Sequence, residues 1–247
     1  MPDHQIADRY SVTPASAPQL DESAYADVLR TDFQDHYVNG RDVWTDENAM
    51  REAPRVLLGA LGDRTDAPHV LDIGTGHGRD AAILADAGCR VTGIDLVESP
   101  EWAALSARTE GRARFDTRSL SDLAGTAVYD AVLDNGCLHH QHPDGYRRYL
   151  NRVRELLRPD GLFTVSVFES ANGPGRLYAN GAQRLYREFT EEELTGLITA
   201  YGFTLVEFLL IPRSTAGLHY LVGTYRATGT PATREDPGTA TPGPEDR

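Results

Sequence analysis

Apolar and polar residues fall into alternating blocks along the middle of the chain. A short apolar run at 69–74 precedes a segment at 78–88 that has the apolar spacing of a helix and ends at Gly88. A second helical segment, 142–161, ends in Pro-Asp-Gly. Further apolar runs stand at 89–96, 113–120, 129–136 and 162–170. Strands that alternate with helices predict a mostly parallel sheet covered by helices on both faces.

The pattern changes near the C-terminus. Thr190 and Glu193 have the spacing of a capping box, so they predict a helix that ends at Gly202. Apolar runs at 204–212 and 217–227 then follow without a helix between them. Two strands joined by so short a connection are expected to be antiparallel.

The segments outside this pattern differ in composition. Two helical stretches at 21–37 and 46–61 come before the first strand, and a glycine-containing insertion at 169–189 follows the fifth. The ends, 1–20 and 228–247, are rich in proline and polar residues and are expected to be disordered. We therefore expect one domain at 21–227, in which the N-terminal helices (21–62) and the insertion form a lid over the site.

Charge and cysteine content exclude several classes of protein. A formal net charge of −13 without a basic run argues against a nucleic acid partner and favours a small-molecule substrate. No apolar stretch is long enough to span a bilayer, and no secretory signal is recognisable, so a cytoplasmic location is expected. Cys89 and Cys137 do not suggest a disulfide framework or zinc ligands. We expect no metal, no membrane contact, and a monomer or homodimer.

The segment DIGTGHG, between the first strand and the following helix, predicts a ligand site. In a parallel sheet, ligands bind beyond the carboxyl ends of the strands, and glycines allow a ligand to lie against the bare backbone. The glycines at 74, 76 and 78 lack the spacing of a nicotinamide site, and the carboxylate of Asp72 would repel a pyrophosphate. That carboxylate suits an ammonium group, and Asp95, at the end of the second strand, is placed to accept two ribose hydroxyls. S-adenosylmethionine carries both groups.

This stretch resembles the first motifs of class I S-adenosylmethionine-dependent methyltransferases, and most closely the branch that modifies small molecules. The resemblance also covers IDL, YDAVLDNGCLHH and LLRPDGLFTVSVF, and extends over about residues 50–225. It implies an α/β, Rossmann-like sheet of seven mostly parallel strands with the last strand antiparallel, which agrees with the count above. The residues that it implies around the cofactor are Asp72, Gly74, Thr75, Gly76, Asp95, Leu96, Ser119, Leu120, Asp134 and Asn135. At the third strand the sequence departs from the family pattern, because Ser119 and Leu120 replace the usual acidic contact to adenine.

The acceptor pocket is expected to lie between the N-terminal helices and the insertion. Tyr25 and Tyr37 of the helices are candidate catalytic residues, as is His140, which we expect to face the cleft as a general base while His139 packs in the interior. The histidines at 139, 140 and 142 could also chelate a metal, although no carboxylate partner is apparent. The candidate substrate-binding residues are Arg176, Tyr178, Arg184 and Arg187. These arginines either form a solvated face or hold a carboxylate, phosphate or phosphonate in a bidentate manner.

The sequence therefore predicts an enzyme that transfers a methyl group from S-adenosylmethionine to a small molecule and releases S-adenosylhomocysteine. The narrowest expectation is O-methylation of a phosphonate, carboxylate or hydroxyl group in natural-product (antibiotic) biosynthesis. The alternatives are methylation at nitrogen, sulfur or halide, a non-catalytic cofactor-binding partner subunit, and a cyclisation carried out on the same fold.

Overall fold

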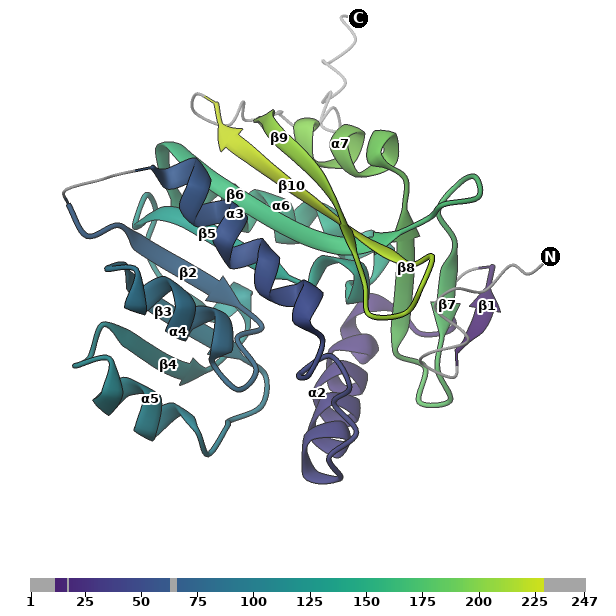
Figure 1. Cartoon of the computed structure of the whole chain (residues 1–247). Helices are drawn as coiled ribbons and strands as arrows, with labels where there is room; N and C mark the ends of the chain where they lie inside the picture. Colours follow the sequence, from purple (N-terminus) through teal and green to yellow (C-terminus); the bar gives the residue numbers. More distant parts are fainter. Residues whose placement is uncertain (1–11, 17, 63–65, 229–247) are drawn as a thin grey trace, which may run out of the picture.

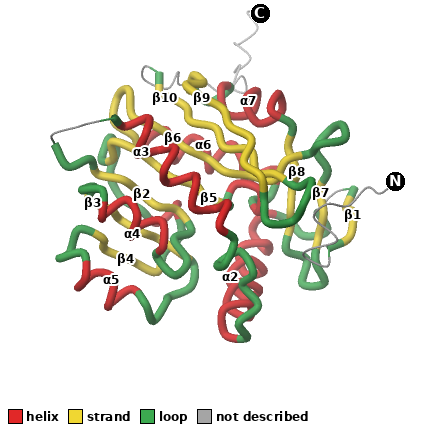
Figure 2. Tube along the Cα trace, viewed as in Figure 1, coloured by secondary structure: helices red, strands yellow, loops and turns green. Residues whose placement is uncertain are grey.

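A computed structural model describes residues 12–16, 18–62 and 66–228. The described strands form one ten-stranded hydrogen-bonded sheet, and seven of them make up its central part in the order β4-β3-β2-β5-β6-β10-β9 (Figures 1 and 2). Their bounds are β2 (His69–Ile73), β3 (Arg90–Asp95), β4 (Ala113–Thr117), β5 (Tyr129–Asn135), β6 (Leu157–Glu169), β9 (Phe203–Pro212) and β10 (His219–Ala227). Strand β10 runs antiparallel to both β6 and β9, whereas β2 to β6 pair in parallel. The predicted α/β fold with an antiparallel last strand is confirmed.

Helices cover both faces of this sheet (Figure 1). On one face α3 (Glu52–Leu61) and α4 (Arg79–Asp86) contribute to one apolar cluster, and on the other α6 (Tyr146–Leu156) and α7 (Glu191–Thr199) contribute to a second. Neighbouring residues of β2, Val70 and Leu71, belong to different clusters and are both fully buried. Burial on both faces explains why the strands appear in the sequence as continuous apolar runs. The short helix α5 (Trp102–Arg108), beside β4, was not predicted.

The insertion after β6 forms a β-hairpin of β7 (Leu177–Ala179) and β8 (Leu185–Phe189). The strand β1 (Thr13–Ala15) pairs antiparallel with β7, and the end of β8 pairs with the end of β6. Residues 13–15 are therefore ordered, contrary to the expectation of disorder for 1–20, because pairing with β7 satisfies their backbone groups. Residues 1–11, 17 and 229–247, on which much of that expectation falls, lie outside the described residues.

The helix α2 (Glu22–Val38) begins at Asp21, whose side chain accepts a hydrogen bond from the Ala24 N–H at 2.8 Å. The second predicted N-terminal helix, 46–61, is divided into the 3₁₀ turn η1 (Asn48–Arg51) and α3. Both predicted helical stretches are thus present within two residues of their expected ends. Figure 1 shows α2 standing apart from the helices that cover the sheet.

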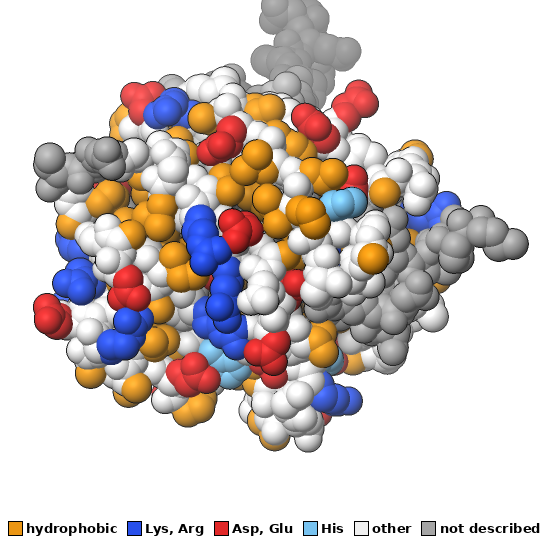
Figure 3. Space-filling model, viewed as in Figure 1, with side chains coloured by type: hydrophobic (Ala, Val, Ile, Leu, Met, Phe, Trp, Pro, Cys, Tyr) orange, Lys and Arg blue, Asp and Glu red, His pale blue; other side chains and the backbone are white. Residues whose placement is uncertain are grey.

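No helix among the described residues is long and apolar enough to cross a membrane. Exposed apolar side chains are concentrated on β9, where Leu205, Val206, Leu209 and Leu210 are each at least 38% exposed. Figure 3 shows apolar side chains gathered over this part of the surface. The described residues contain no group of three His, Cys, Asp or Glu side chains placed to hold a metal ion.

Candidate functional site

A cavity of about 690 Å³ lies at the carboxyl ends of the parallel strands. Its walls come from the glycine turn after β2, the ends of β3 and β5, the helix α2 and the β7–β8 hairpin. This volume lies within the usual range of small-molecule sites, about 300–1,000 Å³. The position agrees with the edge of the sheet that the glycine motif predicted.

The glycine turn forms one end of the cavity. Gly74 and Gly76 have φ values of +67° and +53°, a region of the backbone map that favours glycine. A side chain at Gly74 would also collide with the sulfur of Cys137, whose Sγ would lie 2.0 Å from the added Cβ. At Gly76 the added Cβ would lie 3.1 Å from the hydroxyl of Tyr37. The turn is therefore closely covered from the Cys137 loop and from α2.

Asp95 lines the cavity beside this turn. Its carboxylate accepts hydrogen bonds from the N–H groups of Gly76 at 2.8 Å and Val97 at 3.0 Å. Burial raises the pKa of Asp95, although these hydrogen bonds act in the opposite direction. Next to it, Leu96, Ser119 and Leu120 also line the cavity. Asp95, Leu96, Ser119 and Leu120 thus line one continuous cavity, and their assignment to ribose and adenine stays a prediction.

Asp72 and Asp134 are not among the residues that line the cavity. Asp72 accepts a hydrogen bond from the Thr75 hydroxyl at 2.6 Å, and burial raises its pKa. Asp134 accepts from the Cys137 N–H at 2.6 Å and from the Tyr149 hydroxyl at 2.7 Å, and burial raises its pKa to about 6. Both carboxyl groups thus hold the loops that form the site, and the cofactor contacts expected of them stay a prediction.

Asn135 does line the cavity, and the nitrogen of its side-chain amide is hydrogen-bonded to groups of the protein. Its Nδ2 donates to the Met50 carbonyl and to Asp80, both at 2.6 Å. Because Nδ2 is used in this way, Oδ1 is the atom left to accept, and it has no partner among the described residues. Thr75 and Gly76 belong to the turn but are not in the cavity wall.

Aromatic and imidazole rings line the part of the cavity away from the glycine turn. The rings in this wall include Tyr25, Phe33, Trp44, His139, His140, Phe168, Tyr186 and Tyr220. Phe168 and Tyr220 face each other across the β6–β10 register with ring centroids 5.7 Å apart. Phe168, Tyr186 and Tyr220 were not predicted as site residues. The position of Phe168 near the carboxyl end of its strand is the signal that could have identified it.

Tyr25 and Tyr37, both expected to be catalytic, line the cavity from α2. The hydroxyl of Tyr25 donates to the His140 carbonyl at 2.7 Å and accepts from the Leu185 N–H at 2.9 Å. Tyr25 therefore joins α2 to the loop after β5 and to β8, and its expected catalytic role stays a prediction. Tyr37 lies over the glycine turn, and burial raises its pKa, with the charge of Asp95 adding to the effect.

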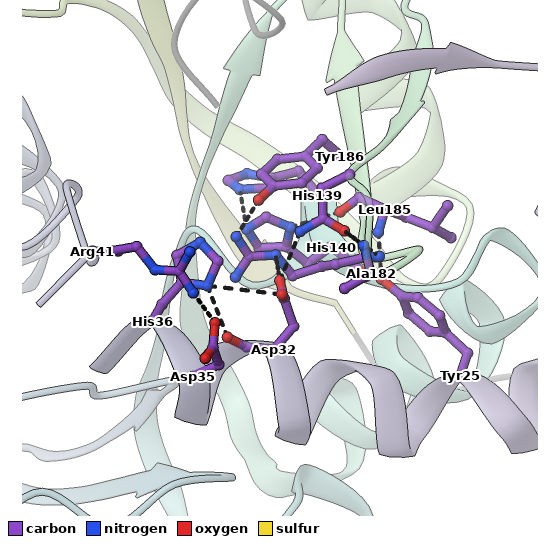
Figure 4. Close-up of polar contacts among 12 residues, drawn as sticks. Tyr25, Asp32, Asp35, His36, Arg41, His139, His140, Ala182, Leu185 and Tyr186 are labelled. Atoms are coloured by element: carbon purple, nitrogen blue, oxygen red, sulfur yellow. Dashed lines mark hydrogen bonds and ion pairs between the residues drawn. The ribbon is translucent and has the colours of Figure 1, made fainter. Parts of the chain in front are cut away.

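Both ring nitrogens of His140 already have partners. Its Nδ1 lies 2.7 Å from the Leu185 carbonyl and its Nε2 lies 3.1 Å from Nε2 of His139 (Figure 4). Burial lowers the pKa of His140 well below its usual value and lowers that of His139 to about 3. These contacts leave His140 without a free nitrogen for a general base, whereas Nδ1 of His139 has no partner among the described residues.

Of the three predicted arginines, the structure brings only Arg184 to the cavity wall. Its side chain is fully buried and its Nε lies 2.9 Å from Oδ2 of Asp32. Arg187 packs against the rings of Tyr146 and Phe189 instead. Arg176 and Tyr178 are also absent from the cavity wall. The structure therefore does not assemble the three-arginine site that the sequence suggested.

Comparison with known proteins agrees with this architecture. Residues 45–208 match the family described as "Methyltransferase domain". The chain is 56% identical to the 1,6-didemethyltoxoflavin-N1-methyltransferase of Burkholderia thailandensis, a match that covers 88% of this chain and 95% of that one with a TM-score of 0.84. That structure contains bound 1,6-didemethyltoxoflavin and S-adenosylhomocysteine. A methyltransferase of Methanosarcina mazei, 19% identical over 68% of this chain and 96% of that one with a TM-score of 0.56, shares the fold.

Two curated relatives match shorter segments. They are a tRNA1(Val) (adenine(37)-N6)-methyltransferase of Pedobacter heparinus, 30% identical over 44% of this chain, and ribosomal RNA small subunit methyltransferase J of Chromobacterium violaceum, 36% identical over 50%. The matches span 55% and 42% of the relatives' own lengths, which is about half. The chain belongs to the methyltransferase family and is a class I enzyme that uses S-adenosylmethionine as its methyl donor.

Proposed function

We propose that this enzyme methylates a ring nitrogen of a flat, nitrogen-rich heterocycle related to 1,6-didemethyltoxoflavin. The observation that carries the proposal is the 56% identity to a methyltransferase solved with that heterocycle and S-adenosylhomocysteine. The match covers 95% of that methyltransferase and 88% of this chain. Such an acceptor is a small molecule, and its modification is a natural-product tailoring step. This replaces O-methylation as the favoured reaction.

The chemistry of the cavity wall supports this acceptor. Phe33, Trp44 and Phe168 offer faces and edges against which a planar ring can stack, and such contacts are worth about 0.5–1.5 kcal/mol beyond burial. The histidines beside them are neutral, because burial lowers the pKa of both His139 and His140. Flat, uncharged rings fit such a wall better than a phosphonate does.

An anionic acceptor is less well supported, because the expected positive charge is already neutralised. Arg184 is ion-paired with Asp32 and lies 4.3 Å from the centre of the Phe33 ring. Releasing it to bind a second anion would leave a buried carboxylate without its partner, which costs several kcal/mol, roughly 3–5. A carboxylate or phosphonate that replaced Asp32 as the partner of Arg184 would therefore bind at this cost.

The proposed reaction is a displacement at the sulfonium methyl group. The acceptor nitrogen forms a bond to the methyl carbon, the carbon–sulfur bond breaks with its electron pair passing to sulfur, and the proton of the acceptor nitrogen passes to water. The chain's contribution is to hold donor and acceptor in line at about 3–3.5 Å. Asp95 and the glycine turn hold the donor, and the aromatic wall positions the acceptor.

The experiment compares four acceptors with S-adenosylmethionine: 1,6-didemethyltoxoflavin, a phenol, a carboxylate and a phosphonate. Mass spectrometry detects the methylated product, and NMR of the product locates the new methyl group. We expect turnover of the heterocycle at nitrogen, and at least tenfold slower turnover with Asp95→Ala when S-adenosylmethionine is limiting. Turnover of only the carboxylate or phosphonate would reject the proposal. Light scattering tests whether the protein is a monomer or a homodimer.

A further inference from the structure

Two neighbouring histidines in the cavity wall form a chain of hydrogen bonds that ends at an unpaired nitrogen. The first hydrogen bond joins the Leu185 carbonyl to Nδ1 of His140 over 2.7 Å. The second joins Nε2 of His140 to Nε2 of His139 over 3.1 Å. Nδ1 of His139 is buried and has no hydrogen-bond partner among the described residues. His139 itself is 3% exposed and lines the cavity. Figure 4 shows the two rings beside Tyr186.

The hydrogen-bond partners determine where each proton lies. A carbonyl oxygen only accepts, so Nδ1 of His140 carries a hydrogen and donates it to Leu185. In a neutral imidazole the other nitrogen is then an acceptor, so Nε2 of His140 accepts from Nε2–H of His139. The remaining nitrogen of His139, Nδ1, consequently carries a lone pair and no hydrogen.

The surroundings keep both rings neutral. Burial lowers the pKa of both histidines, and the positive charges of Arg184 and Arg213 lower that of His139 further. A proton taken up by His139 would therefore not be retained at neutral pH. The ring can accept a hydrogen bond without acting as a base that stores the proton. An acceptor atom buried without a partner is costly, and a ligand that supplies a donor would remove this cost.

We propose that Nδ1 of His139 accepts a hydrogen bond from a ring N–H of the methyl acceptor, and that His140 is a positioning residue that fixes the tautomer of His139. The inference rests on the proposed function, because it assigns the contact to a heterocycle with an N–H group. It makes His139 a specificity residue, since a ring that lacks the donor would leave Nδ1 unpaired. This reverses the roles that the sequence suggested for the two histidines.

The binding test compares 1,6-didemethyltoxoflavin with toxoflavin, in which methyl groups replace the hydrogens at the two nitrogens. Calorimetry in the presence of S-adenosylhomocysteine measures affinity without turnover. We expect His139→Leu to weaken binding of the didemethyl compound by about tenfold to a hundredfold and to leave that of toxoflavin within a few-fold. In His139→Asn, Oδ1 takes the place of Nδ1, so most of the affinity should return. Affinity for S-adenosylhomocysteine should be unchanged in both variants.

The tautomers can be measured without an acceptor. Nitrogen NMR of the labelled wild-type protein should show the hydrogen of His139 on Nε2 and that of His140 on Nδ1. A hydrogen on Nδ1 of His139 would overturn the inference, as would His139→Leu binding both compounds as the wild type does. Failure of the wild type to bind or methylate any heterocycle would instead reject the proposed function, and with it this ligand for His139.

Discussion

Nε of Arg184 lies 2.9 Å from Oδ2 of Asp32, which joins the start of the second hairpin strand to α2. The arginine side chain is 0% exposed and the aspartate side chain 8%. The same oxygen of Asp32 accepts a hydrogen bond from Nδ2 of Asn180 at 2.8 Å. Figure 4 shows Asp32 and Tyr25 on one helix, both directed toward the histidines and Tyr186. The pair therefore fixes the position of α2 over the aromatic end of the cavity.

Asp32→Ala should strongly destabilise the protein, because it leaves a buried guanidinium without its partner. We expect a loss of about 3–5 kcal/mol in the free energy of unfolding, measured by denaturant titration. Asp86→Ala is the matched control. Asp86 forms an ion pair with Arg108 in which both side chains are about half exposed. Its removal should lower the free energy of unfolding by only about 0–1 kcal/mol. Equal losses in the two variants would show that burial of the Arg184 pair has no energetic consequence.

Asp95→Ala should weaken the binding of S-adenosylhomocysteine at least tenfold. A hydrogen bond to a charged acceptor contributes about 1.5–3 kcal/mol, and the loss of contacts to ribose hydroxyls removes one or two of them. Calorimetry gives the affinity, and circular dichroism checks that the fold is intact, since Asp95 also holds Gly76 and Val97. Asp86→Ala, which removes a half-exposed carboxylate outside the cavity wall, is the control. Unchanged affinity in Asp95→Ala would reject its assignment to the ribose.

The buried carboxyl group of Asp134 should make stability depend on pH. Burial raises its pKa from 3.8 to about 6, so between these values the folded state holds a proton that the unfolded state has lost. This contribution to stability is present at low pH and decreases as pH rises from about 4 to about 6. A shift of this size corresponds to roughly 3 kcal/mol.

Asp134→Asn tests this contribution. The amide can still accept from the Cys137 N–H and can donate to the Tyr149 hydroxyl, so the loop should keep its shape. Urea titrations of both proteins from about pH 4 to about pH 7 give the difference in their free energies of unfolding. Contributions of other buried groups cancel in this difference. The stability of the wild type relative to the variant should fall with rising pH, and two parallel curves would contradict the assignment.

Asp42→Ala should speed the release of S-adenosylhomocysteine severalfold. Oδ2 of Asp42 lies 3.2 Å from Nε2 of His77, and the ring of Tyr37 packs on His77 with centroids 5.1 Å apart. These contacts hold the segment after α2 against the glycine turn, and stopped-flow measurement of the dissociation rate would detect its loosening. Asp46→Ala is the control, since the Asp46 side chain is 96% exposed and its contact with Arg79 is long, at 3.5 Å. If both variants release the product at the wild-type rate, the segment does not close the site.

The sequence predicted the parts of the site that follow one another along the chain. The glycine turn and Asp95 stand at the ends of neighbouring parallel strands, so sequence order and sheet order determine that they meet. The role of Arg184 could not be predicted in this way, because its partner Asp32 lies in a distant helix. The strand β8 of the hairpin was not predicted, for a different reason. Leu185, Tyr186, Glu188 and Phe189 are all buried, so β8 lacks the alternation of exposed and buried residues that marks a strand at the surface.

The hydroxyl of Tyr25 binds only main-chain groups, the carbonyl of His140 and the N–H of Leu185. Every amino acid presents that carbonyl, and every one except proline presents that N–H, so the attachment does not depend on the side chains at either position. Mutations in the hairpin that keep Asn180 and Arg184, the two residues bonded to Asp32, can therefore alter the wall that meets the acceptor while α2 stays attached. During evolution, or in directed engineering, acceptor preference can change step by step on a donor site that stays intact.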